Sequence, residues 1–158
     1  IDGMTLPATA VNVGNPHAVC VVTSPLDQFD LSVPPQYDAA IFPEGVNIEL
    51  ITSPCVADSA SASVREAAWT VRMRVHERGS GETRSCGSGA VAVAAVALRT
   101  VQAEIASQAY PQGSPTGIVL VELPGGPLRV ELTESAALLT GVAAIVAKGE
   151  CLLMDSVC

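Results

Sequence analysis

The sequence predicts an α+β domain in which a sheet of many strands curls around one buried helix. Its 158 residues suffice for one domain with a substantial core. Hydrophobic residues make up 49% of the chain and charged residues only 15%, which excludes a disordered polypeptide. A single segment has strong helical character, and short strand-like runs precede and follow it. This order favours a sheet wrapped around the helix over a repeated βαβ array.

The expected strands are short apolar or alternating runs bounded by turn residues. They are Ala10–Val13, Ala18–Thr23, Val46–Ile51, Thr70–His76, Ile118–Leu123, Leu128–Leu132 and Ala143–Ala147. Thr70–His76 alternates cleanly, so one face of this strand should be buried and the other exposed. The Pro-Gly-Gly-Pro sequence between Leu123 and Leu128 predicts a hairpin turn.

The helix is expected from about Gly87 to about Ile105. Its first half, Ala90–Leu98, is apolar on every face rather than on one stripe. Such a helix is enclosed on all sides. The segments 53–62 and 107–117 are expected to be loops, the first rich in Ser and Ala and the second containing two prolines.

Composition and charge exclude several classes of function. The formal net charge is -8 and the eight basic residues are scattered singly, which argues against nucleic acid and against an anionic membrane surface. Ala90–Leu98 is far shorter than the roughly 20 residues needed to cross a bilayer. The five cysteines are odd in number and irregularly spaced, without a CxxC pair, so neither a disulfide framework nor a zinc site is indicated. A cytoplasmic location is therefore expected.

Cys86 is the strongest candidate for chemistry. It lies between a charged, glycine-containing loop and the apolar helix. The free backbone N–H groups and the dipole at a helix start favour thiolate over thiol. Gly87 and Gly89 would let the backbone approach a ligand closely, and Ser88 adds a hydroxyl. A buried structural cysteine is the alternative, but glycines that weaken a helix argue for a functional one.

Two further motifs carry polar side chains that could act beside the thiol. In Gly14-Asn15-Pro16-His17, the imidazole titrates near neutrality and could set the protonation state of a thiol, although turn formation alone would explain the motif equally well. Asn47 begins a strand, where its amide could both donate to and accept from a ligand. Taken alone, the Asn47 signal is weak and a role in a turn is favoured.

Glu77 and Arg78 directly follow the alternating strand. Such a pair is most often a solvated ion pair. Close to a thiol, however, the Arg could hold a carboxylate and the Glu could accept from an ammonium group. His76 is expected to serve packing. Lys148 is the only lysine and lies in the last expected strand, far from these motifs, so a pyridoxal phosphate Schiff base has no good anchor.

Three segments resemble, in order and spacing, the C-terminal half of the diaminopimelate epimerases. They are Gly14–His17, Phe42–Asn47 and Glu77–Gly89. Leu139–Ala143 is also similar to the closing strand pair of that family. The resemblance covers nearly the whole chain, and it implies that residues 1–158 form the C-terminal domain while the N-terminal domain is absent from this chain.

The resemblance also implies a fold and an activity. Each of two similar domains would be a strand-rich, barrel-like sheet wrapped around a central hydrophobic helix. The family converts LL-diaminopimelate to the meso isomer without a cofactor, in the pathway to lysine and peptidoglycan. The implied catalytic residues are Cys86, one of two catalytic cysteines, with His17 and Glu77 tuning the thiols. The implied substrate contacts are Asn15, Asn47, Glu77, Arg78, Gly87 and Ser88, and no metal is expected.

Inversion at an α-carbon needs a base on one face and an acid on the other. By resemblance, the second cysteine belongs to the N-terminal domain, which is thus the expected partner besides diaminopimelate; a homodimer is left open. Three alternatives remain: a cofactor-independent racemase of the proline racemase type, a half-domain that is inactive alone, and a cysteine hydrolase in which His17 activates Cys86.

Overall fold

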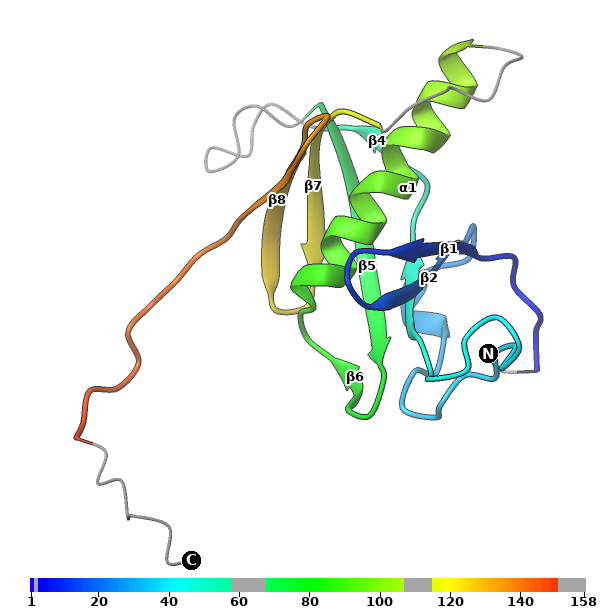
Figure 1. Ribbon diagram of the computed structural model, residues 1–158, viewed down its shortest axis with the longest axis horizontal. Helices are drawn as coiled ribbons and strands as arrows, with labels where there is room; N and C mark the ends of the chain where they lie inside the picture. Colours follow the sequence, from blue (N-terminus) through cyan, green and yellow to red (C-terminus); the bar gives the residue numbers. More distant parts are fainter. Residues whose placement is uncertain (2, 58–67, 107–114, 151–158) are drawn as a thin grey trace, which may run out of the picture.

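The computed structural model describes residue 1 and residues 3–57, 68–106 and 115–150 (Figure 1). Within these residues the chain forms one α-helix, one short 3-10 helix and a nine-stranded sheet. The helices are α1 (Gly87–Ala106) and η1 (Leu26–Gln28). The strands are β1 (Thr9–Asn12), β2 (Pro16–Val21), β3 (Asn47–Ile51), β4 (Cys55–Val56), β5 (Trp69–Glu77), β6 (Gly81–Thr83), β7 (Gly117–Leu123), β8 (Gly126–Leu132) and β9 (Ala137–Thr140).

The strand order β1-β2-β3-β5-β7-β8-β9 gives one curled sheet, with β4 and β6 pairing with β5 beside this path. Neighbours are antiparallel except for β2 with β3 and β5 with β7. The parallel pair β5 and β7 is possible because α1 carries the chain back between them. The helix contacts strands from β1 at one edge to β9 at the other, and Figure 1 shows it lying across the sheet. The predicted strand-rich sheet wrapped around a hydrophobic helix is confirmed.

The helix is enclosed as its composition predicts. Among the helical residues 87–102, every side chain is buried or half-buried, and Ala90, Val93 and Ala97 have no exposed surface. Their small size lets the inner face of the sheet approach the helix closely, and the main core forms between them. Ser88, Val91 and Ala95 lie on a half-exposed stripe, so the sheet does not close completely around the helix.

The outer face of the sheet is covered in part by the segment between β2 and β3. Leu26, Phe29 and Leu31 pack there against Cys20, Val22 and Leu50. The outward side chains of β5 hold this segment through its carbonyl groups: Arg74 donates to Phe29 O at 2.9 Å, and His76 Nδ1 lies 2.8 Å from Leu31 O. The expected packing role of His76 is confirmed. The outer face of β5 is less exposed than its alternation predicts, because this segment covers it.

The prediction of a final strand at Ala143–Ala147 is wrong. The sheet ends with β9 (Ala137–Thr140), and residues 141–150, with Lys148 among them, run as an extended segment away from the body (Figure 1). Val142 and Val146 are 93% and 95% exposed there. An apolar run becomes a strand only when a neighbouring strand takes up its hydrogen bonds, and none lies beside this segment in the described part of the chain.

The remaining expectations concern turns and loops. The hairpin between β7 and β8 is confirmed, with Leu123 opposite Gly126. The loop expected at 53–62 contains the short strand β4, while its residues 58–62, like residues 107–114 of the other loop, lie outside the described residues. No helix in the described residues is long and apolar enough to span a membrane.

Candidate active site

Cys86 lies at the start of α1 and caps it. Ala90 N donates to Cys86 O at 2.9 Å, the first hydrogen bond of the helix. Gly89 N donates to Cys86 Sγ at 3.4 Å, so the sulfur takes the position of a capping side-chain oxygen. The thiol is 7% exposed. The sequence correctly predicts that this cysteine is placed at the first turn of a buried helix.

Strand alternation directs the polar residues of β2, β3 and β5 toward this helix start. The middle of the inner face is apolar, with Val19 and Ile51 packing against the helix. At the end next to Cys86 the same face carries His17, Asn47 and Glu49 instead, and both His17 and Glu49 have no exposed surface. The parallel register of β2 and β3 pairs His17 with Asn47, which brings these groups together.

A line of polar contacts connects this buried end with the thiol. His17 Nδ1 lies 2.6 Å from Glu49 Oε1, and His17 Nε2 lies 3.0 Å from Asn15 Oδ1. Asn15 Nδ2 donates to Ser88 Oγ at 3.3 Å. Ser88 Oγ in turn lies 3.6 Å from Cys86 Sγ. The Gly-Asn-Pro-His motif and the cysteine motif, far apart in sequence, therefore meet at one place.

Asn47 and Arg78 form a second connection at the edge of the site. Asn47 Nδ2 donates to Pro16 O at 3.0 Å, and Asn47 Oδ1 accepts from Arg78 N at 3.0 Å. The Arg78 guanidinium donates to Glu44 O at 2.9 Å. Gly45 has a φ of 86°, and a Cβ there would lie 2.8 Å from Arg78 Cδ, so only glycine lets the arginine side chain pass. The Asn47 amide thus connects Pro16 of the Gly14–His17 motif with Arg78 of the Glu77–Gly89 segment.

The environment of Cys86 opposes the expected thiolate. Burial raises the pKa of the Cys86 thiol, and the nearby Glu77 carboxylate raises it further, while hydrogen bonds from Ser88 and Gly89 lower it only in part. The net pKa lies above the ordinary cysteine value. The prediction of a thiolate is wrong, because burial and the neighbouring Glu77 outweigh the hydrogen bonds from Ser88 and Gly89. Thr83 Oγ1 donates to Glu77 Oε1 and orients that carboxylate.

The glycines next to Cys86 have packing reasons that the sequence does not reveal. A Cβ at Gly89 would lie 2.8 Å from Glu49 Oε1 and 2.9 Å from Met73 Cε. A Cβ at Gly87 would lie 3.1 Å from Leu139 Cδ2. Gly89 therefore lets the first turn of α1 rest directly on β3 and β5.

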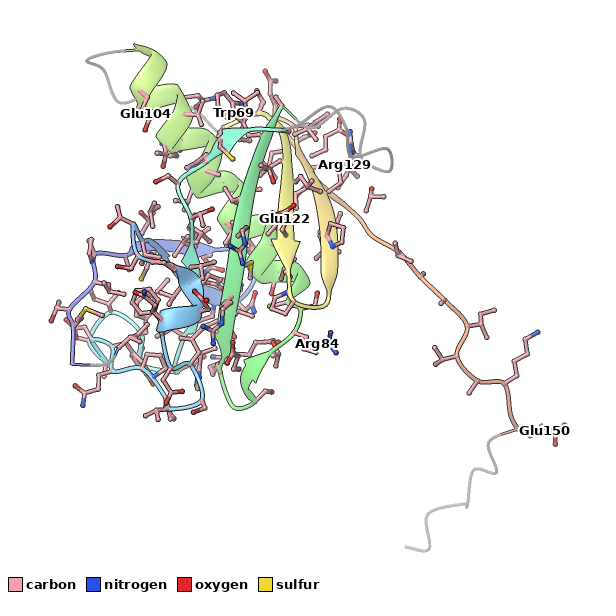
Figure 2. All side chains as sticks on the ribbon, turned by 180° about the vertical axis from the view of Figure 1, so that it is seen from behind. Trp69, Arg84, Glu104, Glu122, Arg129 and Glu150 are labelled. Carbon is pink, nitrogen blue, oxygen red and sulfur yellow. The ribbon has the colours of Figure 1, made fainter. Side chains whose placement is uncertain are left out.

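The loop that leads into Cys86 is held by the turn between β7 and β8. Gly125 N donates to Arg84 O at 2.7 Å, and the Arg84 guanidinium donates back to Pro124 O at 3.0 Å. Figure 2 labels Arg84 at this end of the β7–β8 hairpin. A Cβ at Gly125 would lie 2.9 Å from Arg84 O, so the close approach of the two backbones requires glycine. The two loops fix the chain just before the thiol.

Sequence reasoning missed two residues of this site, Glu49 and Thr83. Glu49 could have been found from the sequence, since it places a carboxylate between the apolar Ile48 and Leu50. Thr83 has no sequence feature that distinguishes it from an ordinary strand residue. Among the described residues, no group of three or more His, Cys, Asp and Glu side chains could hold a metal ion.

A sheet curled around a hydrophobic helix, with a thiol at the helix start among Asn, His, Glu and Arg side chains, defines an α+β domain of the diaminopimelate epimerase-like class. Residues 9–146 match the family model described as diaminopimelate epimerase. The chain belongs to the diaminopimelate epimerase family.

Curated relatives agree with this assignment. The chain is 41% identical over 154 residues to the diaminopimelate epimerase of Mycobacterium tuberculosis, an alignment that covers 95% of this chain and 45% of that protein. The diaminopimelate epimerases of Mycobacteroides abscessus and Mycobacterium ulcerans are each 40% identical with the same coverage. The chain thus spans less than half the length of these relatives.

Replacing Gly89 by Ala is expected to destabilise the fold, although Ala is ordinarily the better helix residue by about 1 kcal/mol. The new methyl group would lie 2.8 Å from Glu49 Oε1, which its contact with His17 holds in place. We expect the free energy of unfolding to fall by about 1–3 kcal/mol, measured by denaturant unfolding. Gly149→Ala, whose methyl group would meet nothing within 4 Å, is the matched control. Unchanged stability of Gly89→Ala would contradict this packing.

Replacing Glu77 by Gln is expected to speed the alkylation of Cys86 by iodoacetamide at neutral pH. Removing the charge lowers the pKa of the thiol and so increases the reactive thiolate fraction. In the unmodified chain the raised pKa keeps the thiol protonated, so the rate should climb only in alkaline solution. Peptide mapping by mass spectrometry measures the rate, with added glutathione as internal reference.

The control for this experiment is Glu122→Gln, which removes an exposed carboxylate from β7. It should leave the alkylation rate of Cys86 unchanged. If Cys86 is alkylated no faster in Glu77→Gln than in the Glu122→Gln control, Glu77 does not hold the thiol in its protonated form.

Proposed function

We propose that this chain forms the C-terminal domain, residues 1–158, of an isomerase that converts LL-diaminopimelate to meso-diaminopimelate by two-base proton transfer without a cofactor. The observation that carries the proposal is the Cys86 thiol at the start of α1, with Glu77 and the Asn15–Ser88 contact beside it. Membership of the diaminopimelate epimerase family supports the same reaction. The substrate belongs to the pathway to lysine and peptidoglycan, and a cytoplasmic location is proposed with it.

Cys86 acts as the acid in one direction of this reaction. The α-proton of an amino acid is far less acidic than a thiol, so the carbanion-like transition state must be stabilised as the proton leaves. Cys86 starts as a thiol because burial and Glu77 raise its pKa. After it delivers its proton to the α-carbon, the thiolate is stabilised by Gly89 N–H and Ser88. In the reverse direction the same thiolate removes the proton.

The remaining polar groups bind the substrate. The backbone N–H groups of Gly87 and Ser88 at the helix start suit the reacting carboxylate, since this end of the helix carries positive partial charge. Arg78 suits a carboxylate and Glu77 an ammonium group. Asn15 and Asn47 complete the proposed contacts. Recognition of a second amino-acid centre by the Glu77–Arg78 pair favours diaminopimelate over proline.

The opposing base belongs to the N-terminal domain of the same enzyme in this proposal. The chain spans 45% of the Mycobacterium tuberculosis relative, which leaves room for such a domain in a full-length polypeptide. The half-exposed stripe of Ser88, Val91 and Ala95 on α1 and the exposed Val142 and Val146 are apolar or small and suit burial against it. In this proposal, His17 and Glu77 tune the two catalytic thiols.

Solvent deuterium should enter the α-position of diaminopimelate in the presence of the full-length polypeptide. Cys86→Ser should slow turnover roughly 10²–10⁴-fold, because a hydroxyl is a much weaker acid than a thiol. NMR of the substrate measures both. Cys55→Ser, which changes an exposed cysteine on β4, is the matched control and should leave the rate unchanged. Uptake of deuterium into proline but not into diaminopimelate would overturn the proposal.

Residues 1–158 alone should show no epimerase activity, because they present one acid and no opposing base. The same exchange assay, run on the isolated chain and on the full-length polypeptide at equal concentration, measures this. Turnover by the isolated chain would contradict the requirement for the N-terminal domain.

A further inference from the structure

Glu49 is a carboxylate buried in the middle of β3. It has no exposed surface, and its strand neighbours Ile48 and Leu50 pack in apolar clusters on the opposite face of the sheet. An ionisable group in such a place is unfavourable unless it is paired, so a carboxylate here calls for a specific partner. Neither the substrate contacts proposed above nor the core requires it.

The partner of Glu49 is the imidazole of His17. Glu49 Oε1 lies 2.6 Å from His17 Nδ1, and both side chains are fully buried. Glu49 Oε2 has no hydrogen-bond partner among the described residues, so the carboxylate meets the imidazole through Oε1. The other ring nitrogen, His17 Nε2, points toward Asn15 at 3.0 Å and thus toward Ser88 and Cys86.

We propose that Glu49 is a positioning residue that fixes the ring orientation of His17 and holds the proton at Nδ1, so that Nε2 is the nitrogen that exchanges a proton at the site. The inference rests on the proposed function, in which His17 tunes a catalytic thiol. Which ring nitrogen is protonated is set by the hydrogen bond that the other one makes. In hydrolytic triads and in metal sites, a carboxylate that is hydrogen-bonded to a histidine orients the ring and fixes its tautomer.

The packing around Glu49 leaves the carboxylate little freedom. Gly89 of α1 lies directly against it, since a Cβ at Gly89 would lie 2.8 Å from Glu49 Oε1 and 2.9 Å from Met73 Cε of β5. The turn that places Cys86 at the helix start therefore also confines the carboxylate. His17 cannot rotate without leaving a buried carboxylate unpaired, which is strongly unfavourable.

The groups around Glu49 act on the pKa of its carboxyl group in both directions. Burial raises the pKa of Glu49 and His17 lowers it, while the negative charge of Glu77 on β5 raises it. In the described part of the chain, Cys86 at the start of α1 and Cys20 on the outer side of β2 are the other titratable groups around it, and burial raises the pKa of Cys20 to about 11. Both thiols are therefore neutral at neutral pH and add no charge beside the Glu49–His17 pair.

The test compares three variants of the full-length polypeptide. Glu49→Gln keeps the shape and removes the charge, and Glu49→Asp keeps the charge on a shorter side chain. Glu131→Gln is the matched control, because it removes a carboxylate from a partly exposed ion pair on β8. The measurements are kcat, KM, the pH profile of kcat, and the proton NMR signal of the His17 ring N–H, which a short bond to a carboxylate moves far downfield.

We expect kcat of Glu49→Gln to fall roughly 10–100-fold with KM little changed. This is the magnitude typical of losing a hydrogen-bond partner that orients a functional side chain. The acidic limb of its kcat profile should shift to lower pH, because the imidazolium loses its counter-charge, and the downfield signal should vanish. Glu49→Asp should recover part of kcat, and Glu131→Gln should match the unmodified protein. A merely structural glutamate would lower the unfolding temperature and leave the kcat profile of the folded protein unchanged.

Native kcat and pH profile in Glu49→Gln would overturn the inference. Absence of the downfield signal from the unmodified protein would also overturn it, and that measurement needs no variant to fold. The NMR measurement of the His17 ring N–H is made without substrate. If the unmodified polypeptide binds no diaminopimelate and yet shows the signal, the proposed function fails while the pairing of Glu49 with His17 stands.

Discussion

The contact between the first turn of α1 and the inner face of β2, β3 and β5 is the constraint on which the site depends. Because Gly89 has no side chain, the helix start can approach Glu49 to within contact distance. This approach connects the Cys86 thiol, through Ser88 and Asn15, with the His17 imidazole from a segment more than sixty residues away in the sequence. The apolar remainder of the helix, enclosed by the sheet, holds the contact in register.

The same closeness decides the chemical state of the thiol. A helix start by itself stabilises a thiolate, and here the N–H of Gly89 does reach the sulfur. Burial of the sulfur and the negative charge of Glu77 act in the opposite direction and prevail. The result is a protonated thiol that is already surrounded by the donors that would stabilise its anion. Such an arrangement suits a group that must give up a proton and later regain it.

Hydrogen bonds between side chains and backbone groups hold the described part of the site in place. Asn47 connects Pro16 to Arg78, and Arg84 connects the loop before Cys86 to the β7–β8 turn. The opposite side, along the half-exposed stripe of α1, remains uncovered in the described residues. The described groups are thus preorganised, as the proposed proton transfer would require.

The sequence by itself determined the curled sheet, the enclosed helix, the β7–β8 hairpin and the place of Cys86, because these follow from local apolar patterns and from glycines beside a helix start. Tertiary structure alone decided the extended course of residues 141–150, the pKa direction of Cys86 and the pairing of Glu49 with His17. Strand formation needs a neighbour to accept its hydrogen bonds, and a pKa reflects burial and charges from distant segments. Neither the pairing of a strand nor the pKa of a buried group is therefore determined by a residue and its neighbours in the sequence.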